Sequence, residues 1–259
     1  LVSAYIQEIY ESQVALFLVK QQSVVSDVRD VLDEQFQRLP AFEQGIMYWL
    51  AIEREAVSLD DLRENIVHRS TGDLTEALRS LRNRYLVEQV AGEVTVQNVV
   101  MEYVTRRVIE QACDEIERES ITRLHTHPVI KAQAREYVRR SQVRLILEPI
   151  AERLCTTLAR RDIERRLGTI LVKLREQPSH PPGYAAGTIL NLLIYLKANL
   201  ADFDFSGLTI KQTDLQGAAL HGTNFAHVHF ESCNFTHTFG RILSVAYSPD
   251  GKQLAAGTV

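Results

Sequence analysis

The sequence NLADFDFSGLTIKQTDLQGAALHGTNFAHVHFESCNF, residues 199–235, carries a bulky apolar residue at every fifth position. The eight centres are Leu200, Phe205, Ile210, Leu215, Leu220, Phe225, Phe230 and Phe235. Neither an α-helix, with a period of about 3.6, nor an ordinary strand, with a period of about 2, produces this spacing. A fixed period held over consecutive repeats predicts a solenoid, and solenoids present surfaces and spacers more often than catalytic groups.

The positions around these centres are also patterned. The residue before each centre is usually short and polar, and the residue two places before it is mostly small or apolar, with Phe203 and Leu208 as larger exceptions. This pattern resembles the pentapeptide-repeat family, whose motif is roughly A-[ND]-[LF]-x-x. The resemblance implies a right-handed, four-sided β-helix with one repeat on each side. Residues that stack one coil apart are then about twenty positions apart, and the repeats make about two coils.

Length and composition limit the class of protein. A chain of 259 residues predicts two or three units, and 45% hydrophobic with 24% charged residues indicates a globular fold. The net charge of −4 provides no general attraction to nucleic acid or to an anionic membrane. Cys113, Cys155 and Cys233 are far apart and form no C-x-x-C pair, which favours a reduced, cytoplasmic setting. No apolar run reaches membrane-spanning length, so we expect no membrane partner.

The two ends of the chain indicate a piece of a larger protein. Leu1 stands within a helical pattern, and Val259 stands within a β pattern. The sequence GRILSVAYSPDGKQLAAGTV, residues 240–259, alternates apolar residues around a turn at 248–251 and resembles the opening hairpin of a WD-repeat propeller blade. A full blade needs about four strands and about 40 residues. We therefore expect only the start of a blade over residues 238–259.

Residues 24–105 predict a winged helix, that is, three helices followed by a two-stranded wing. The expected helix starts are Ser26 as an N-cap, Pro40, Ser58 with Asp61 as a capping box for a helix through Val67, and Asp73 with Glu76 as a second capping box. YLVEQV and EVTVQN, joined by the turn Ala91-Gly92, predict the hairpin.

The order of these parts resembles the winged-helix portion of the NB-ARC proteins, a class of STAND-type signal-transduction ATPases. The resemblance runs from LDEQFQRLP through VTVQNVVMEYVTRRVIEQ, and residues 1–23 fit the end of the helical part of the NB-ARC module. In that family the His of a Met-His-Asp motif approaches the ADP phosphates. The matching triplet here is Val96-Gln97-Asn98, so the resemblance implies Gln97 and Asn98 as nucleotide contacts. The alternative is that both residues only end a strand and cap the next helix.

DNA binding is the alternative function for a winged helix. The candidate recognition helix buries Leu74, Ala77, Leu78 and Leu81 and exposes Thr75, Glu76, Arg79, Arg82 and Asn83. Two arginines and an asparagine can read a groove of the duplex. The wing tip Ala-Gly-Glu offers no cation to phosphate, however, and the unit is not basic. This composition argues against DNA as the partner and favours a protein-packing role.

Residues 106–178 form a predicted helical connector. From Arg106 to Glu176 there are 16 Lys or Arg and 11 Asp or Glu, a balance of about +5. Interleaved acids predict a solvated, ion-paired surface, and a basic face for nucleic acid or an acidic partner is the alternative. EQPSHPPGYAAG marks a boundary, after which Thr188 to Lys197 predict a helix that caps the repeats within a unit at 179–237.

No motif in the sequence predicts catalysis. No G-x-x-x-x-G-K-[ST] occurs, so we expect no nucleotide hydrolysis and no cofactor in this piece, with ATP or ADP bound only in the parent protein. The repeats carry histidines and a cysteine that we tested for metal-ligand spacing, namely His221, His227, His229, Cys233 and His237. None of these histidines is a coil apart from another, so we predict no metal site.

The predicted fold is therefore a multidomain α+β chain: a winged helix, a helical connector, a short right-handed pentapeptide-repeat β-helix and a partial propeller blade. The predicted function is a non-catalytic regulatory and scaffold segment of a STAND-type NTPase. Its partners would be the nucleotide-binding domain and the WD-repeat propeller of the same protein, with a protein ligand as a further partner. The alternatives are a DNA-binding winged-helix transcriptional regulator and, with less support, an enzyme with an unfamiliar site.

Overall fold

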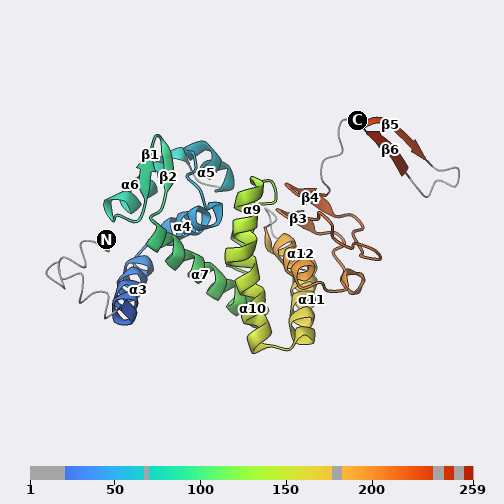
Figure 1. Cartoon of the computed structure of the whole chain (residues 1–259), viewed down its shortest axis with the longest axis horizontal. Coiled ribbons are helices and arrows are strands. Elements are labelled where there is room, and N and C mark those ends of the chain that lie inside the picture. The colour runs from blue at the N-terminus through green and yellow to red at the C-terminus, as the bar shows by residue number, and fades with distance from the viewer. Residues whose placement is uncertain (1–20, 67–69, 177–182, 236–241, 248–253, 259) are drawn as a thin grey trace.

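The structure of the chain is a computed structural model that describes residues 21–66, 70–176, 183–235, 242–247 and 254–258. It is mostly helical, with a few short strands (Figure 1). The helices of this described part are α3 (Gln21–Gln37), α4 (Ala41–Glu53), α5 (Leu59–Asn65), α6 (Thr71–Asn83), α7 (Asn98–Glu117), α8 (Arg123–Thr126), α9 (Glu136–Gln142), the π-helix η1 (Val143–Leu147), α10 (Glu148–Thr157), α11 (Arg160–Glu176), α12 (Ala185–Tyr195) and the 3₁₀ turn η2 (Leu200–Asp202). The strands in the same residues pair as β1 (Glu88–Val90) with β2 (Glu93–Thr95), β3 (Thr209–Lys211) with β4 (His229–Glu231), and β5 (Ile242–Tyr247) with β6 (Leu254–Thr258).

Serine side chains cap the starts of α5 and α6. Ser58 accepts a hydrogen bond from the backbone N–H of Asp61 at 3.1 Å, which is one half of the predicted capping box. The Asp61 carboxylate accepts from the Ser58 hydroxyl at 2.7 Å, in place of the reciprocal bond from the Ser58 backbone. The predicted capping box of Asp73 with Glu76 is wrong, because Ser70 caps α6 and Asp73 is the reciprocal partner of Ser70. Serine and aspartate are comparable N-cap residues. The true box therefore lies one turn earlier than the sequence pattern suggested.

Of the other predicted helix boundaries, the one at Ser26 is wrong and the one at Pro40 is confirmed. Ser26 lies inside α3, which is already formed at Gln21, so its prediction as an N-cap is wrong. Valines on both sides of Ser26 continue the helical pattern, and a single serine is tolerated within a helix. Pro40 directly precedes α4 with a φ of −55°, as helix entry requires. Asn65 ends α5, and the predicted end at Val67 lies outside the described residues.

The predicted hairpin is confirmed. β1 and β2 are antiparallel, and Gln89 stands opposite Val94. The turn residues Ala91 and Gly92 have φ values of 53° and 90°, and positive φ at both central residues suits the twist of a tight hairpin. Val57 bridges Val94 on the other side of β2, with N···O distances of 2.9 and 2.8 Å. The chain order is thus α4, the Val57 bridge, α5, α6 and the hairpin.

Buried apolar side chains form two clusters in the described residues. The first, here called the N-terminal core, joins α3 to α6, the hairpin and the first half of α7. The second, the repeat core, joins Ile52 at the end of α4, the second half of α7, helices α8 to α12 and the pentapeptide stretch. Val104 of α7 belongs to the N-terminal core, and Ile116 belongs to the repeat core. One continuous helix therefore connects the two cores.

α9, η1 and α10 form one helical run over residues 136–157 in the middle of the molecule (Figure 1). Pro149 has no N–H to bond the carbonyl of Leu145, and its ring would clash with that carbonyl in a regular α-helix. The wider π turn of η1 directly precedes α10, where it accommodates the proline. The run therefore continues past Pro149 without ending.

The pentapeptide stretch pairs with itself at the predicted spacing of one coil. Ile210 of β3 lies beside Phe230 of β4 in a parallel register, which is a separation of 20 positions. The same separation recurs in the parallel bridges Asp204–Asn224 and Asp214–Asn234. The rings of Phe205 and Phe225 stack with their centroids 5.5 Å apart. The centres of the first coil are buried, whereas the last centre, Phe235, is 49% exposed.

α12 lies over the edge of the first coil, where a capping helix was predicted (Figure 1). The side chain of Asn191 in α12 bonds the backbone groups that a neighbouring strand would otherwise pair with at this edge. Its Nδ2 donates to the carbonyl of Gln212 at 3.0 Å, and its Oδ1 accepts from the N–H of Asp214 at 3.1 Å. An uncovered sheet edge would leave such backbone groups unpaired. The helix starts at Ala185, slightly before the predicted Thr188.

The two oversized repeat residues pack against this helical cover. Phe203 and Leu208 are both buried in the repeat core. A Cβ built on Gly168 of α11 would lie 3.9 Å from Cε1 of Phe203, so this ring lies in van der Waals distance of the helix. Large side chains fit at these inward positions because helices, and not only neighbouring repeats, line the first coil.

Several predicted features lie wholly or partly outside the described residues. These are the helices before residue 20, part of the boundary at 177–182, and the turn at 248–251. The strands that flank this turn are described, and β5 pairs with β6 in antiparallel register as the sequence predicts.

Candidate functional site

Polar side chains join the N-terminal core to the repeat core through α9 and the segment before it. We call this set the polar junction. Its members are Glu53, His127, Lys131, Arg139, Gln142, Gln212, Asp214 and Asn234. They come from α4, from residues 127–142 and from both coils of the repeats. Their contacts define how the two parts of the chain are held together.

One side of the polar junction is bonded to α4. Gln142 is fully buried; its Nε2 donates to the carbonyl of Ile52 at 2.7 Å, and its Oε1 accepts from the N–H of Lys131 at 2.8 Å. The Lys131 ammonium lies 2.7 Å from the carboxylate of Glu53, which also accepts from the Asn65 amide at 2.8 Å. Removal of one partner from such a buried set leaves unsatisfied groups, which is costly. The segment is therefore firmly attached to the end of α4.

The other side of the polar junction is bonded to the repeats. The guanidinium of Arg139 lies 2.8 Å from the carboxylate of Asp214 in the first coil. The N–H of Ala132 donates to Oε1 of Gln212 at 2.9 Å, and the carbonyl of Ala132 accepts from the Asn234 side chain in the second coil. One short segment thus contacts both coils and α4.

His127 lies in the part of the polar junction nearest to α4. Its Nε2 is 3.0 Å from the carbonyl of Gly45, so this nitrogen carries the proton, and its Nδ1 is 2.8 Å from the Thr126 hydroxyl. The pKa of His127 is lowered to about 4, chiefly by burial and also by the nearby Arg123 guanidinium, and the hydrogen bond to Gly45 opposes this shift. The imidazole is therefore neutral at physiological pH.

A row of rings and cations continues from His127 to the repeats. The ring of Trp49, the single tryptophan of the chain, lies 5.3 Å from that of His127 and 5.6 Å from that of Tyr184. Lys211 of the first coil places its ammonium 5.9 Å from the Tyr184 ring and pairs with Glu231 of the second coil at 2.9 Å. Burial raises the pKa of Tyr184 to about 12. The fluorescence of Trp49 therefore reports on the contact between the two cores.

The sequence did not predict the polar junction. Its members are spread from residue 53 to residue 234, and no local spacing connects them. The one local signal is Gln142, a polar residue that shares a helical face with the apolar Val138 and Ile146. Such a residue inside a helix needs hydrogen-bond partners from elsewhere in the fold.

The structure places Gln97 and Asn98 at the start of α7. The Nε2 of Gln97 donates to the carboxylate of Glu88 in the hairpin at 2.7 Å, and Asn98 is an exposed first-turn residue. The Glu88 carboxylate is therefore the hydrogen-bond partner of the Gln97 side chain in this arrangement. Nucleotide contact at Gln97 and Asn98 stays a prediction for the parent protein.

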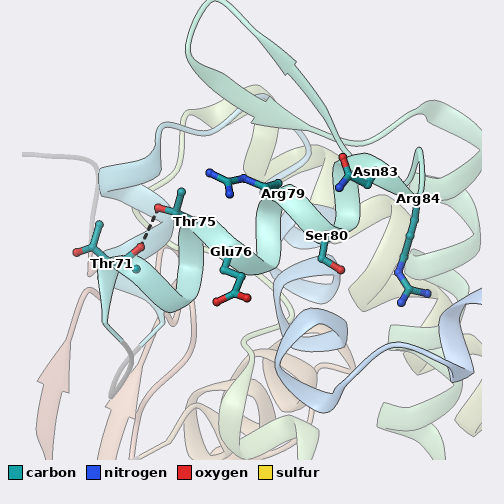
Figure 2. A pocket seen from close by; sticks show the side chains of 8 residues that line it. Thr71, Thr75, Glu76, Arg79, Ser80, Asn83 and Arg84 are labelled. Carbon is teal, nitrogen blue, oxygen red and sulfur yellow. Dashed lines mark hydrogen bonds between the residues drawn. The ribbon is translucent and has the colours of Figure 1, made fainter.

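The exposed face of α6 is as the sequence predicts. Leu74, Ala77, Leu78 and Leu81 are buried, and Thr75, Glu76, Arg79, Arg82 and Asn83 are exposed. Figure 2 shows this face, on which Arg79 and Glu76 leave the helix on opposite sides. The surface that a DNA-reading helix would present thus carries acidic as well as basic side chains.

Several basic side chains of the connector form ion pairs with its own acids. The carboxylate of Glu119 lies 3.2 Å from Arg165, 3.7 Å from Arg166 and 3.6 Å from Lys173. Arg160 pairs with Glu164 one turn away at 3.0 Å. These contacts agree with the ion-paired surface predicted for the helices, and the excess of basic residues in this stretch remains.

The residues that the structure describes contain neither a metal-binding cluster nor a membrane-spanning helix. No group of three or more His, Cys, Asp or Glu there is arranged to hold a metal ion, and His237 lies outside these residues. No helix in this part of the chain is long and apolar enough to cross a membrane. Cys113, Cys155 and Cys233 are all free thiols.

Comparison with known proteins identifies the repeats. The family described as pentapeptide repeats matches residues 198–237 in eight copies, which confirms the prediction for this stretch. The fold thus defines a mostly helical protein with pentapeptide repeats. The chain is 40% identical to an uncharacterized WD repeat-containing protein of the cyanobacterium Nostoc sp. (strain PCC 7120), over 293 residues that cover 98% of this chain. It spans 23% of that relative's length, and no solved structure matches it.

Together, the pentapeptide repeats and the WD repeat-containing relative suggest a scaffold or protein-interaction role. Solenoid repeats stack into surfaces that other protein parts contact.

Proposed function

We propose that this chain is a non-catalytic scaffold segment that holds two parts of a larger signalling protein at a set distance and angle. The observation that carries the proposal is the polar junction, in which residues 127–142 are bonded to α4 and to both coils. α7 also spans both cores without a break. A flexible linker would show neither feature.

The finer architecture that we propose follows the chain order. Residues 24–105 are a winged helix, a reading supported by the sequence α4, Val57 bridge, α5, α6 and hairpin. Residues 106–178 are the helical connector, and residues 179–237 are a capping helix with a right-handed β-helix, supported by the pairing at 20 positions. Residues 238–259 are the start of a WD-repeat blade, supported by the β5–β6 pair and by the relative's name.

In the parent protein, we propose that this segment couples an upstream nucleotide-binding module to a downstream WD-repeat sensor. The winged helix would move with the ATP or ADP state of that module, and the connector and repeats would carry the movement onward. A carboxylate at Glu88 holds Gln97 in the present arrangement. Direct contact between Gln97 and a nucleotide would therefore need a rearrangement of this pair.

A distance measurement tests the scaffold. Spin labels at Glu76→Cys on α6 and His221→Cys in the repeats, in a Cys155→Ser and Cys233→Ser background, report the separation of two exposed positions. We expect a single narrow distance distribution for the otherwise unmodified chain. Combined Lys131→Met and Arg139→Met substitutions remove the ion pairs to Glu53 and Asp214 and should broaden it.

The matched control replaces two exposed arginines, Arg144→Met and Arg161→Met, for which the described residues provide no ion pair. This variant should keep the narrow distribution. A broad distribution in the unmodified chain would contradict a rigid scaffold. An unchanged distribution after both ion pairs are removed would contradict the role of the polar junction in holding it.

A further inference from the structure

A shallow groove lies between α6 and the hairpin. Its floor is apolar and is formed by Leu59, Leu78, Val87 and Val94, and Arg79 and Arg82 stand at its rim. Its volume is about 190 Å³, below the roughly 300–1,000 Å³ of small-molecule sites. The groove therefore accommodates one or two side chains and not a cofactor.

The rim arginines are available to a partner. Within the described residues Arg79 has no ion pair or hydrogen bond, and Arg82 makes one long hydrogen bond of 3.4 Å to Gln89. Figure 2 shows the Arg79 side chain extended and separated from the Glu76 carboxylate by the body of α6. An unpaired guanidinium can bind a carboxylate or a phosphate in a bidentate manner.

The surroundings of the groove favour a carboxylate-bearing protein over a nucleic acid. Residues 59–97 carry seven Asp or Glu and five Lys or Arg, whereas a DNA-binding surface is strongly basic. Glu88 and Glu93 of the hairpin lie where a winged helix would meet the phosphate backbone. Leu59 is 37% exposed in the floor, and an apolar floor suits an apolar side chain and not a phosphate.

We propose that this groove docks a protein segment in which an apolar side chain is flanked by carboxylates. The apolar side chain enters between Leu59 and Val94, and the carboxylates pair with Arg79 and Arg82. This surface is separate from the polar junction, so the proposal adds a partner to the scaffold and does not depend on its rigidity.

The test uses defined probes on the full chain. The first is a labelled peptide of about 12 residues with two leucines one helical turn apart, flanked by glutamates. The second has lysines in place of the glutamates, and the third is a duplex DNA of about 20 base pairs. We expect the acidic peptide to bind with a Kd of about 100 µM or below, and the lysine peptide and the duplex at least about tenfold more weakly.

Two variants locate the binding. The combined Arg79→Glu and Arg82→Glu substitutions should weaken the acidic peptide by about tenfold or more, and Leu59→Ser should weaken it severalfold. Arg161→Glu, on α11, is the matched charge reversal and should have no effect. Far-ultraviolet circular dichroism verifies that each variant is folded.

Three results would overturn the proposal. They are absence of binding by the acidic peptide, equal binding of the lysine peptide, and duplex binding that is tighter than peptide binding and lost in the double arginine variant. The last result would instead assign this face to DNA.

Discussion

Gly187→Ala is expected to lower the free energy of unfolding of the repeat core by about 3 kcal/mol. Gly187 lies in α12 at its closest approach to the first coil. An added Cβ would overlap the carbonyl oxygen of Lys211 and would come within 2.9 Å of the Lys211 carbonyl carbon and of Thr213 Oγ1. The Thr213 hydroxyl also donates to the Gly187 carbonyl at 3.3 Å. Backbone atoms of a paired strand cannot move aside as the end of a flexible side chain can.

The loss of stability in Gly187→Ala should include more than the cost of this single clash. If α12 moves outward, Asn191 loses its bonds to Gln212 and Asp214, and the edge of the first coil is uncovered. We would measure urea unfolding by far-ultraviolet circular dichroism and would expect a lower midpoint together with faster proteolysis of the repeats. A small coil stack with an open edge should be the first part to open.

Gly168→Ala in α11 is the matched control. Its added Cβ would find only Cε1 of Phe203, at the ordinary contact distance of 3.9 Å. Replacement of a helical glycine by alanine should then raise the free energy of unfolding by up to about 1 kcal/mol. Equal stability of the two alanine variants would show that α12 does not pack on the coil as closely as described.

Local patterns explain why much of the fold could be predicted. The spacing of 20 between Ile210 and Phe230 follows directly from a repeat of five residues, and the hairpin follows from the turn Ala91-Gly92. Each of these signals is contained within a short stretch. The burial of Leu78 and the exposure of Arg79 follow in the same way from the helical period of α6.

Errors arose where two local signals competed. Ser70 and Asp73 are both good N-cap residues, and only the backbone around them determines which one caps α6. Ser26 likewise looks like a cap, although the apolar pattern continues on both sides of it.

The polar junction could not be predicted because it depends on tertiary contacts. Gln142 bonds to Ile52, which is 90 positions away, and Asn234 bonds to Ala132, which is 102 positions away. The sequence shows which of these residues are polar but not which partners meet. The same limit applies to the groove, whose apolar floor combines α5, α6 and the hairpin.

Protonation of His127 is expected to destabilise the chain by about 3 kcal/mol in total as the pH falls. Burial lowers the pKa of His127 to about 4 in the folded protein, against about 6.5 for an unfolded histidine. The folded state therefore favours the neutral ring. Its contribution to stability is fully present above pH 6.5, decreases below it, and is lost as the pH passes through about 4. Integration over this window predicts a loss of about 2.5 kcal/mol between pH 7.5 and pH 4.5.

The neighbours of His127 explain why the charged ring is unfavourable. Burial is the main cause, because it withholds water from a charged ring. The Arg123 guanidinium lies 4.6 Å from the ring of Tyr48, which itself packs edge-on against His127, so the local charge is already positive. No carboxylate is hydrogen-bonded to the imidazole within the described residues.

Urea unfolding at several pH values, followed by Trp49 fluorescence, measures this effect at the ring that contacts His127. The His127→Gln variant can still donate from its amide to Gly45, but it does not titrate. The free energy of unfolding of the unmodified chain, measured relative to that of this variant, should therefore fall by about 2.5 kcal/mol from pH 7.5 to pH 4.5. A pH-independent difference between the unmodified chain and His127→Gln would mean that the imidazole is not held neutral between the two cores.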